Sequence, residues 1–275
     1  MDERDIDKVV ETLPRNLYSA YDAILKRSSD EELTRLLLHI ILRAGEPFKV
    51  EELQIAFNLA LVEDVRNVNY ERLKRLSNAT FKKNVAGLCG AFITFVGERA
   101  FIFHLTAWEF LRTPRSAEPR AHLGLTWAHT FDLCDSYHIL FRLCVMVLLD
   151  PRVTQVAKIA SQDLRSHGLL RDKVRSYCRG LPLLRYVSLR WREHLFNAAG
   201  GRHPATLTED GPGQLLIGEL CDLSTDLFWS WYLCFWCYAR EENPKYQYLA
   251  ETSWYRSLSS QSLTTGCSLG ADQGK

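Results

Sequence analysis

The spacing of apolar residues is strand-like in one short stretch of an otherwise helical chain, and this stretch restricts the possible folds more than any other feature. Within residues 29–90, three segments repeat apolar residues at helical spacing. The clearest of them has one apolar face, formed by Leu33, Leu36, Leu37, Ile40 and Ile41. Residues 91–104 are instead rich in Phe, Ile and Val, and Gly97-Glu98 among them suits a type II′ hairpin turn. Three helices followed by a β-hairpin is the order of a winged-helix unit, which we predict over residues 29–112.

Local signals set the expected ends of these elements. Ser29 is expected to cap the first helix, with Glu32 completing a capping box three residues later. Gly45 stops this helix and Pro47 prevents its return. The second and third helices are predicted over residues 50–61 and 78–88. A short helix after the hairpin is expected to carry Trp108, Phe110 and Leu111.

The rest of the chain is also predicted to be helical, so the expected fold class is mostly α. Residues 1–28 form a helical lead-in, and prolines mark a linker over residues 113–124. A helical bundle or arm is predicted over residues 125–240, and a disordered tail, rich in Ser, Thr and Gly, over residues 241–275. The helices expected within the bundle cover residues 125–149, 183–198, 214–223 and 225–239, with a Gly- and Pro-rich loop over 200–213.

Charge and cysteine content restrict the expected partners and location. The chain has 34 Lys and Arg against 33 Asp and Glu, a formal net charge of +1, so no global basic field favours nucleic acid or an anionic membrane. Most of its 8 Cys lie in apolar, helix-like runs, as buried reduced thiols do. Residues 1–8 are charged and show no secretory signal, and the longest apolar runs are too short to span a bilayer. We therefore expect a cytoplasmic protein with no membrane partner.

Motifs of self-sufficient catalytic sites are missing from the sequence. It contains no Walker A loop, no nucleophile-elbow serine, no two-histidine zinc helix and no EF-hand loop. Cys234 and Cys237 have metal-ligand spacing, but they stand alone in an aromatic segment and zinc needs four ligands. We interpret them as core cysteines, with a metal or redox role as the less favoured alternative. The sequence thus predicts a non-enzymatic chain without a cofactor or metal of its own.

A winged-helix unit also raises the possibility of DNA binding. The third predicted helix carries Lys82 and Lys83, and Arg72, Lys74 and Arg75 precede it. A DNA reader needs basic residues on its groove-facing side, together with phosphate contacts. This cluster is modest and acidic residues flank it, so a solvated charged face is the preferred interpretation. DNA binding remains an alternative.

A third possibility is a scaffold that binds a protein partner through an aromatic helix. Phe228, Trp231 and Phe235 form an aromatic stripe on the last predicted helix. Aromatic stripes at helical spacing are common in helix cores as well as at interfaces. The scaffold function therefore stays an alternative to a regulatory role.

His104 is the candidate binding residue. It is predicted to end the second hairpin strand, directly before a helix. An imidazole at such a junction can reach a phosphate beside the N-terminus of a helix. The alternative is a packed histidine that hydrogen-bonds the backbone.

Six sequence blocks in order resemble a known family. They read LPRNLYSAYDAIL (13–25), PFKVEEL (47–53), LCGAFI (88–93), FHLTAWEFL (103–111), LRYV (184–187, with Trp191 and His194) and LCDLS (220–224, with Phe228 and Trp231). Together they resemble the region after the nucleotide-binding domain of fungal NACHT proteins. These are signal-transducing NTPases of the STAND class that often carry ankyrin repeats. Their winged helix is also known by its likeness to a domain of GPI-inositol deacylase, which implies no deacylase activity here.

This resemblance implies a function. A full-length relative would bind ATP or ADP in a P-loop domain, and that domain, in the same or a related chain, would be the main partner beside other proteins. His104 falls where a histidine of related proteins contacts the nucleotide phosphates, although Leu105 stands where the best-known version has Asp. This chain shows neither a P-loop nor an ankyrin repeat. The expected function is a non-catalytic regulatory module that relays nucleotide-dependent conformational change, with His104 as phosphate sensor.

Overall fold

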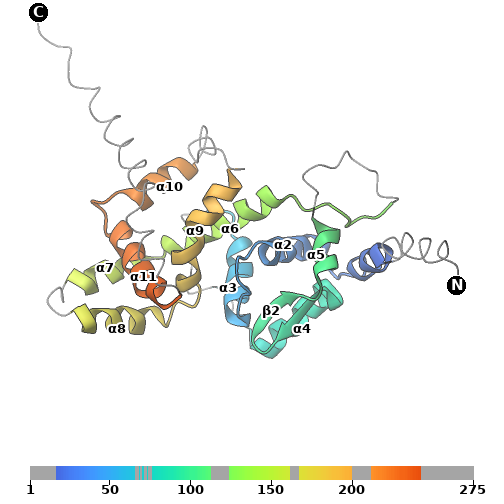
Figure 1. Cartoon of the computed structure of the whole chain (residues 1–275), viewed down its shortest axis with the longest axis horizontal. Helices are drawn as coiled ribbons and strands as arrows, with labels where there is room; N and C mark the ends of the chain where they lie inside the picture. The colour runs from blue at the N-terminus through green and yellow to red at the C-terminus, as the bar shows by residue number, and fades with distance from the viewer. Residues whose placement is uncertain are drawn as a thin grey trace, which may run out of the picture. The chain divides into compact units, whose positions relative to one another are not determined.

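The computed structural model describes residues 17–65, 68, 70, 73, 76–112, 124–161, 167–199 and 212–242. This part of the chain is mostly α-helical and contains one two-stranded sheet, which confirms the predicted fold class (Figure 1). The chain forms two compact units. The first consists of the described parts of Met1–Met146 and Arg190–Thr206, and the second of those of Val147–Leu189 and Leu207–Lys275.

The elements follow one another with short connections over most of the chain. After a helix at residues 17–25 come α2 (Glu31–Leu42), α3 (Val50–Ala60), α4 (Asn78–Cys89), the 3₁₀ turn η2 (Gly90–Phe92), β1 (Ile93–Val96), β2 (Arg99–Ile102) and α5 (Leu105–Leu111). They are followed by α6 (Leu133–Leu148), α7 (Pro151–Ser161), α8 (His167–Cys178), α9 (Leu184–Ala198), α10 (Pro212–Cys221) and α11 (Asp226–Glu242). The helix order and hairpin predicted for residues 29–112 are present, while the winged-helix assignment stays a prediction.

The hairpin has the predicted turn. β1 and β2 pair antiparallel, with Val96 opposite Arg99. Between them Gly97 has a φ of +59°, and Glu98 does not have a positive φ. A positive φ at the first turn residue alone is what a type II′ turn requires, and glycine adopts it without steric cost.

The cap of α2 differs from the prediction. Asp30, not Ser29, is the N-cap, and its Oδ1 accepts a hydrogen bond of 3.0 Å from the backbone N–H of Leu33. The predicted cap is therefore wrong by one residue, and the predicted capping box is wrong as well, because Leu33 and not Glu32 lies three residues after the cap. A carboxylate at this position satisfies a free N–H and also interacts favourably with the helix dipole.

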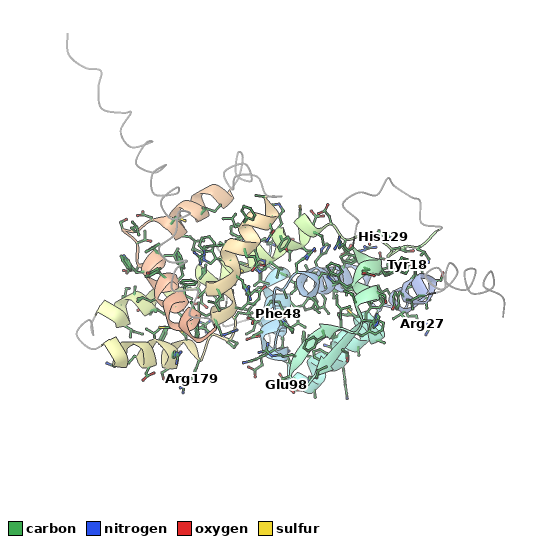
Figure 2. All side chains as sticks on the ribbon, viewed as in Figure 1. Tyr18, Arg27, Phe48, Glu98, His129 and Arg179 are labelled. Carbon is green, nitrogen blue, oxygen red and sulfur yellow. The ribbon has the colours of Figure 1, made fainter. Side chains whose placement is uncertain are left out.

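An aromatic cluster holds the helix at residues 17–25 in the first unit. The Tyr21 ring makes edge contacts with Phe92, Phe103 and Phe110 at centroid distances of 5.4, 5.6 and 5.6 Å. Tyr18 contacts Phe110 at a centroid distance of 5.2 Å. It also contacts His129 at 5.8 Å, and Figure 2 labels both of these residues. Such edge contacts add about 0.5–1.5 kcal/mol each to the burial of apolar area. The described end of the predicted lead-in is therefore part of this unit's core.

Helix α6 begins later than predicted. Residues 125–132 form a loop in which His129 has a φ of +57°, and the helix starts at Leu133. The loop backbone is held by α5, because the N–H of Phe131 donates to the carbonyl of Leu111 at 3.1 Å. Asp132 then accepts from the N–H of Cys134 at 2.6 Å, at the start of the helix. Trp127 and Phe131 are buried within this loop, so the helix predicted over residues 125–149 is wrong for residues 125–132.

The second unit is built around α11, which packs on α7 and α8 (Figure 1). The buried hydroxyl of Ser230 accepts a hydrogen bond of 3.1 Å from the N–H of Ala157. Trp231 is buried and donates from its indole nitrogen to the carbonyl of Leu220 at 2.7 Å. Burial of polar atoms with these partners avoids the cost of leaving them unpaired.

The predicted domain ranges do not coincide with the two compact units. Residues 133–146 and 190–199, predicted within the helical domain, belong to the first unit. Most of the predicted linker (113–123) and most of the predicted tail (243–275) lie outside the described residues, as do residues 1–16. Helix α11 extends to Glu242, two residues into the range predicted as tail. The predicted domain boundaries thus stay predictions.

Candidate functional site

His104 is the N-cap of α5. Its Nδ1 accepts a hydrogen bond of 3.2 Å from the backbone N–H of Thr106 and lies 2.8 Å from the Oγ1 of the same residue. The hydroxyl of Tyr21 lies 2.7 Å from that Oγ1. A hydrogen-bonded chain therefore runs from the buried Tyr21 through Thr106 to the imidazole and fixes the ring.

This geometry assigns the tautomer of His104. A backbone N–H can only donate, so Nδ1 must be the acceptor. The neutral imidazole then carries its proton on Nε2, which is a hydrogen-bond donor. Within the described residues the structure gives Nε2 no hydrogen-bond partner, and the side chain is exposed. Of the alternative, a packed histidine that hydrogen-bonds the backbone, the structure has the backbone hydrogen bond at Nδ1, but the side chain is exposed and not packed.

Two exposed apolar side chains flank His104. The side chain of Phe103 is 40% exposed and that of Leu105 is 66% exposed. The N–H of Phe103 donates to the carbonyl of Phe92 at 3.1 Å, which anchors this end of the hairpin. We refer to residues 103–105 as the β2–α5 corner. It presents a hydrogen-bond donor between two apolar groups, a combination that fits a protein surface carrying an anionic group.

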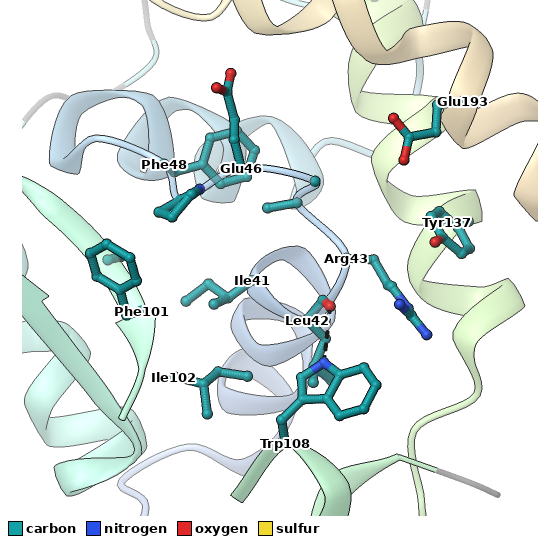
Figure 3. Close-up of a pocket in the computed structure, with 14 residues that line it drawn as sticks. Ile41, Leu42, Arg43, Glu46, Phe48, Phe101, Ile102, Trp108, Tyr137 and Glu193 are labelled. Carbon is teal, nitrogen blue, oxygen red and sulfur yellow. Dashed lines mark hydrogen bonds between the residues drawn. The ribbon is translucent and has the colours of Figure 1, made fainter. Parts of the chain in front are cut away.

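A separate cavity of about 380 Å³ opens in the first unit (Figure 3). Its walls come from the end of α2, the 43–48 loop, β2, and single residues of three helices, namely Trp108, Tyr137 and Glu193. The Arg43 guanidinium carbon lies 5.2 Å from the Trp108 ring centre and 5.4 Å from that of Tyr137. Trp108 is held in turn by its indole N–H, which donates to the carbonyl of Leu42 at 3.4 Å.

The charges around the cavity balance one another. Arg43 supplies a cation whose Nε is buried without a hydrogen-bond partner among the described residues. Glu46 and Glu193 line the same cavity, and Glu193 is paired with Arg190 at 3.0 Å. The lining residues include no Ser, Thr, His or Cys that could act as a nucleophile or imidazole base. His104 is not among them, so the cavity and the corner are distinct features.

The basic cluster considered for DNA binding is partly neutralised. Lys82 donates to Glu98 at 2.9 Å and to the carbonyl of Gly97 at 3.3 Å. The hydrogen bond from Lys82 holds the pKa of the Glu98 carboxyl below its usual value. Lys83 is exposed on the same helix. Arg72, Lys74 and Arg75 lie outside the described residues.

The aromatic stripe and the cysteine motif of α11 are both in the interior. Phe228, Trp231 and Phe235 are buried, which removes them from the surface that the scaffold alternative needs. Cys234 and Cys237 are buried as well. In the described part of the chain, no group of three or more His, Cys, Asp or Glu side chains is arranged to hold a metal ion.

Comparison of the chain with models of known families, with curated proteins and with solved structures finds no match. Across the described residues, every helix is too short or too polar to cross a bilayer.

Proposed function

We propose that this chain is a non-catalytic regulatory module whose β2–α5 corner docks on a nucleotide-binding domain of the NACHT type. The observation that carries the proposal is the exposed run Phe103-His104-Leu105, in which a fixed imidazole lies between two apolar side chains. Burial of a leucine-sized side chain on docking is worth roughly 1.5–3 kcal/mol. The corner therefore has both an apolar driving force and a polar group that can give specificity.

His104 would serve as the phosphate contact of this interface. Its Nε2–H is a donor, and a donor facing a phosphate oxygen makes a charge-assisted hydrogen bond. The nucleotide, ATP or ADP, would be bound by the partner domain, in the same or a related chain, and this chain would supply a contact but no cofactor site. As part of this proposal we place the chain in the cytoplasm, where a partner domain would meet ATP and ADP.

The hydrogen-bonded link between His104 and the helix at residues 17–25 gives a physical basis for relaying a conformational change through this chain. Tyr21 reaches the imidazole through Thr106, with distances of 2.7 and 2.8 Å. The same tyrosine packs against Phe103 of the corner at 5.6 Å. Docking that shifts the corner would change the environment of Tyr21, and a movement of the helix would change the orientation of the imidazole. Reciprocal coupling of this kind is what a regulatory module needs.

The phosphate role of His104 is tested by His104→Asp in a protein that joins this chain to a NACHT nucleotide-binding domain. Aspartate is a strong N-cap, so α5 should keep its start and the thermal midpoint should not fall. The new carboxylate repels phosphate and removes a hydrogen bond worth about 1.5–3 kcal/mol, so ADP should dissociate about tenfold faster or more. Stopped-flow release of a fluorescent ADP measures this rate.

The control for the added charge is His138→Asp, because His138 is an exposed histidine on α6 of the same unit. It should leave the release rate unchanged. If wild type and His104→Asp release ADP at the same rate, His104 does not contact the nucleotide. Micromolar binding of ADP to the chain without a nucleotide-binding domain would contradict the non-catalytic module.

A further inference from the structure

The thiols of Cys178 and Cys234 lie against one another in the core of the second unit. Their Sγ atoms are 3.7 Å apart, and both residues are buried. Cys178 is the last residue of α8 and Cys234 lies within α11, so the pair joins two packed helices. The sequence motif suggested Cys234 with Cys237, but the sulfur contact that the structure gives Cys234 comes from a residue 56 positions earlier.

We propose that Cys178 and Cys234 form a reversible disulfide when the protein meets a peroxide. The separation is a van der Waals contact between sulfurs, and side-chain rotation must close it to the bond length of about 2.05 Å. The two thiols need no third residue to react with one another. The disulfide would join α8 to α11 inside one compact unit, independently of what the β2–α5 corner binds.

The surroundings give the two thiols different roles. Hydrogen bonds from the thiol of Cys234 and the hydroxyl of Tyr238 point to the sulfur of Cys178 and hold its pKa below the usual value for cysteine. The pKa of Cys234 is raised, because it donates to Cys178 and is buried. The thiolate is the reactive form of cysteine, so Cys178 is the attacking residue.

The reaction balances with hydrogen peroxide as the oxidant. The Cys178 sulfur attacks one peroxide oxygen, the O–O bond breaks, and sulfenic acid and one water form. The Cys234 sulfur then attacks the sulfenic sulfur, its proton goes to the departing hydroxyl, and a second water leaves. Two thiols are oxidised to one disulfide while one peroxide is reduced to two waters.

Access to the buried pair comes from the end of α8. Cys178 occupies the last position of the helix, and Arg179 and Gly180 directly after it are exposed. Helix ends open more readily than helix centres, so local opening of this turn exposes Cys178 without unfolding the unit. Cys144 is also buried but lies inside α6, so it should react much more slowly.

The full chain, reduced and then treated with hydrogen peroxide, tests the proposal. After alkylation of the remaining thiols, non-reducing peptide mapping should find Cys178 joined to Cys234. The thermal midpoint should rise by several degrees and return on reduction, since a crosslink across 56 residues restricts the unfolded chain. A Cys234–Cys237 disulfide, sulfinic acid at Cys178, or crosslinked dimers alone would overturn it.

Variants make the result specific. Cys178→Ser should abolish both the crosslink and the thermal shift, whereas Cys134→Ser, at an exposed cysteine, should change neither. Tyr238→Phe should slow the oxidation several-fold and still give the same disulfide. If Cys178→Ser does not fold, the peptide map of the wild type and the oxidation rate of Tyr238→Phe still test whether Cys178 and Cys234 form the disulfide. An unchanged rate in Tyr238→Phe would overturn the assignment of Cys178 as the attacking thiol.

Discussion

Replacing Phe110 by alanine is expected to lower the free energy of unfolding of the first unit by about 3–5 kcal/mol. The Phe110 side chain is fully buried on α5, and its ring contacts Tyr18, Tyr21 and Phe92 from two other segments. Truncation would leave a cavity where these segments meet and would loosen the helix at residues 17–25. Urea denaturation measures the loss of unfolding free energy, and hydrogen exchange of the amides in that helix shows whether the loss is in this unit.

Leu105→Ala is the matched control for Phe110→Ala. Leu105 is on the same helix, but its side chain is 66% exposed, so its truncation should change stability by less than about 0.5 kcal/mol. The two variants together separate a packing effect from a general effect on α5. Similar small losses in both would mean that α5 does not hold the aromatic cluster together.

Acid should destabilise the first unit through His194. This histidine is buried near Tyr137, and burial, with a smaller effect of the Arg190 charge, lowers its pKa from 6.5 to about 3. Between these values the unfolded chain binds a proton at His194 and the folded chain does not, so stability falls as the pH falls. The loss should approach about 1.4 kcal/mol per pH unit below 6.5.

A comparison of variants isolates the contribution of His194. Urea denaturation of wild type, His194→Phe and His138→Gln at several pH values between 7 and 5 gives three slopes. The slope for His194→Phe should be the smallest, since it lacks the titrating ring, and that for His138→Gln should equal the wild-type slope because His138 is exposed. A wild-type slope retained in His194→Phe would show that His194 is not kept neutral by burial.

In the first unit, the helices and the hairpin could be predicted from the sequence where the spacing of apolar residues agrees with the turn and capping residues. The helices α2, α3 and α4, the hairpin turn at Gly97 and the short helix α5 were predicted close to their observed bounds. The loop at residues 125–132 was not, because Trp127 and Phe131 have helical spacing while tertiary hydrogen bonds to α5 determine the backbone. The spacing of residues along the chain does not show which distant residues will hydrogen-bond the backbone.

The candidate sites depend even more on contacts between distant residues. His104 was placed correctly before a helix, but its tautomer is set by the backbone N–H of Thr106. The hydroxyl of Thr106 in turn lies 2.7 Å from that of Tyr21, a residue 85 positions away. The cavity was missed because Arg43, Trp108 and Tyr137 come from three elements that share no motif. Cys178 was likewise not recognised as the neighbour of Cys234. The motif of Cys234 and Cys237 shows only their spacing along one helix, and it contains no information about a cysteine on another helix.

The most direct test of the proposed function is the affinity of this chain for an isolated nucleotide-binding domain of a NACHT protein. Isothermal titration should compare wild type with Leu105→Gln and with Val96→Gln. The side chains of Leu105 and Val96 are almost equally exposed, at 66% and 65%, but Val96 lies outside the β2–α5 corner and is therefore the control. We predict that wild type and Val96→Gln bind equally and that Leu105→Gln binds about tenfold more weakly. Equal affinity for all three, or no binding by wild type, would contradict docking through the corner.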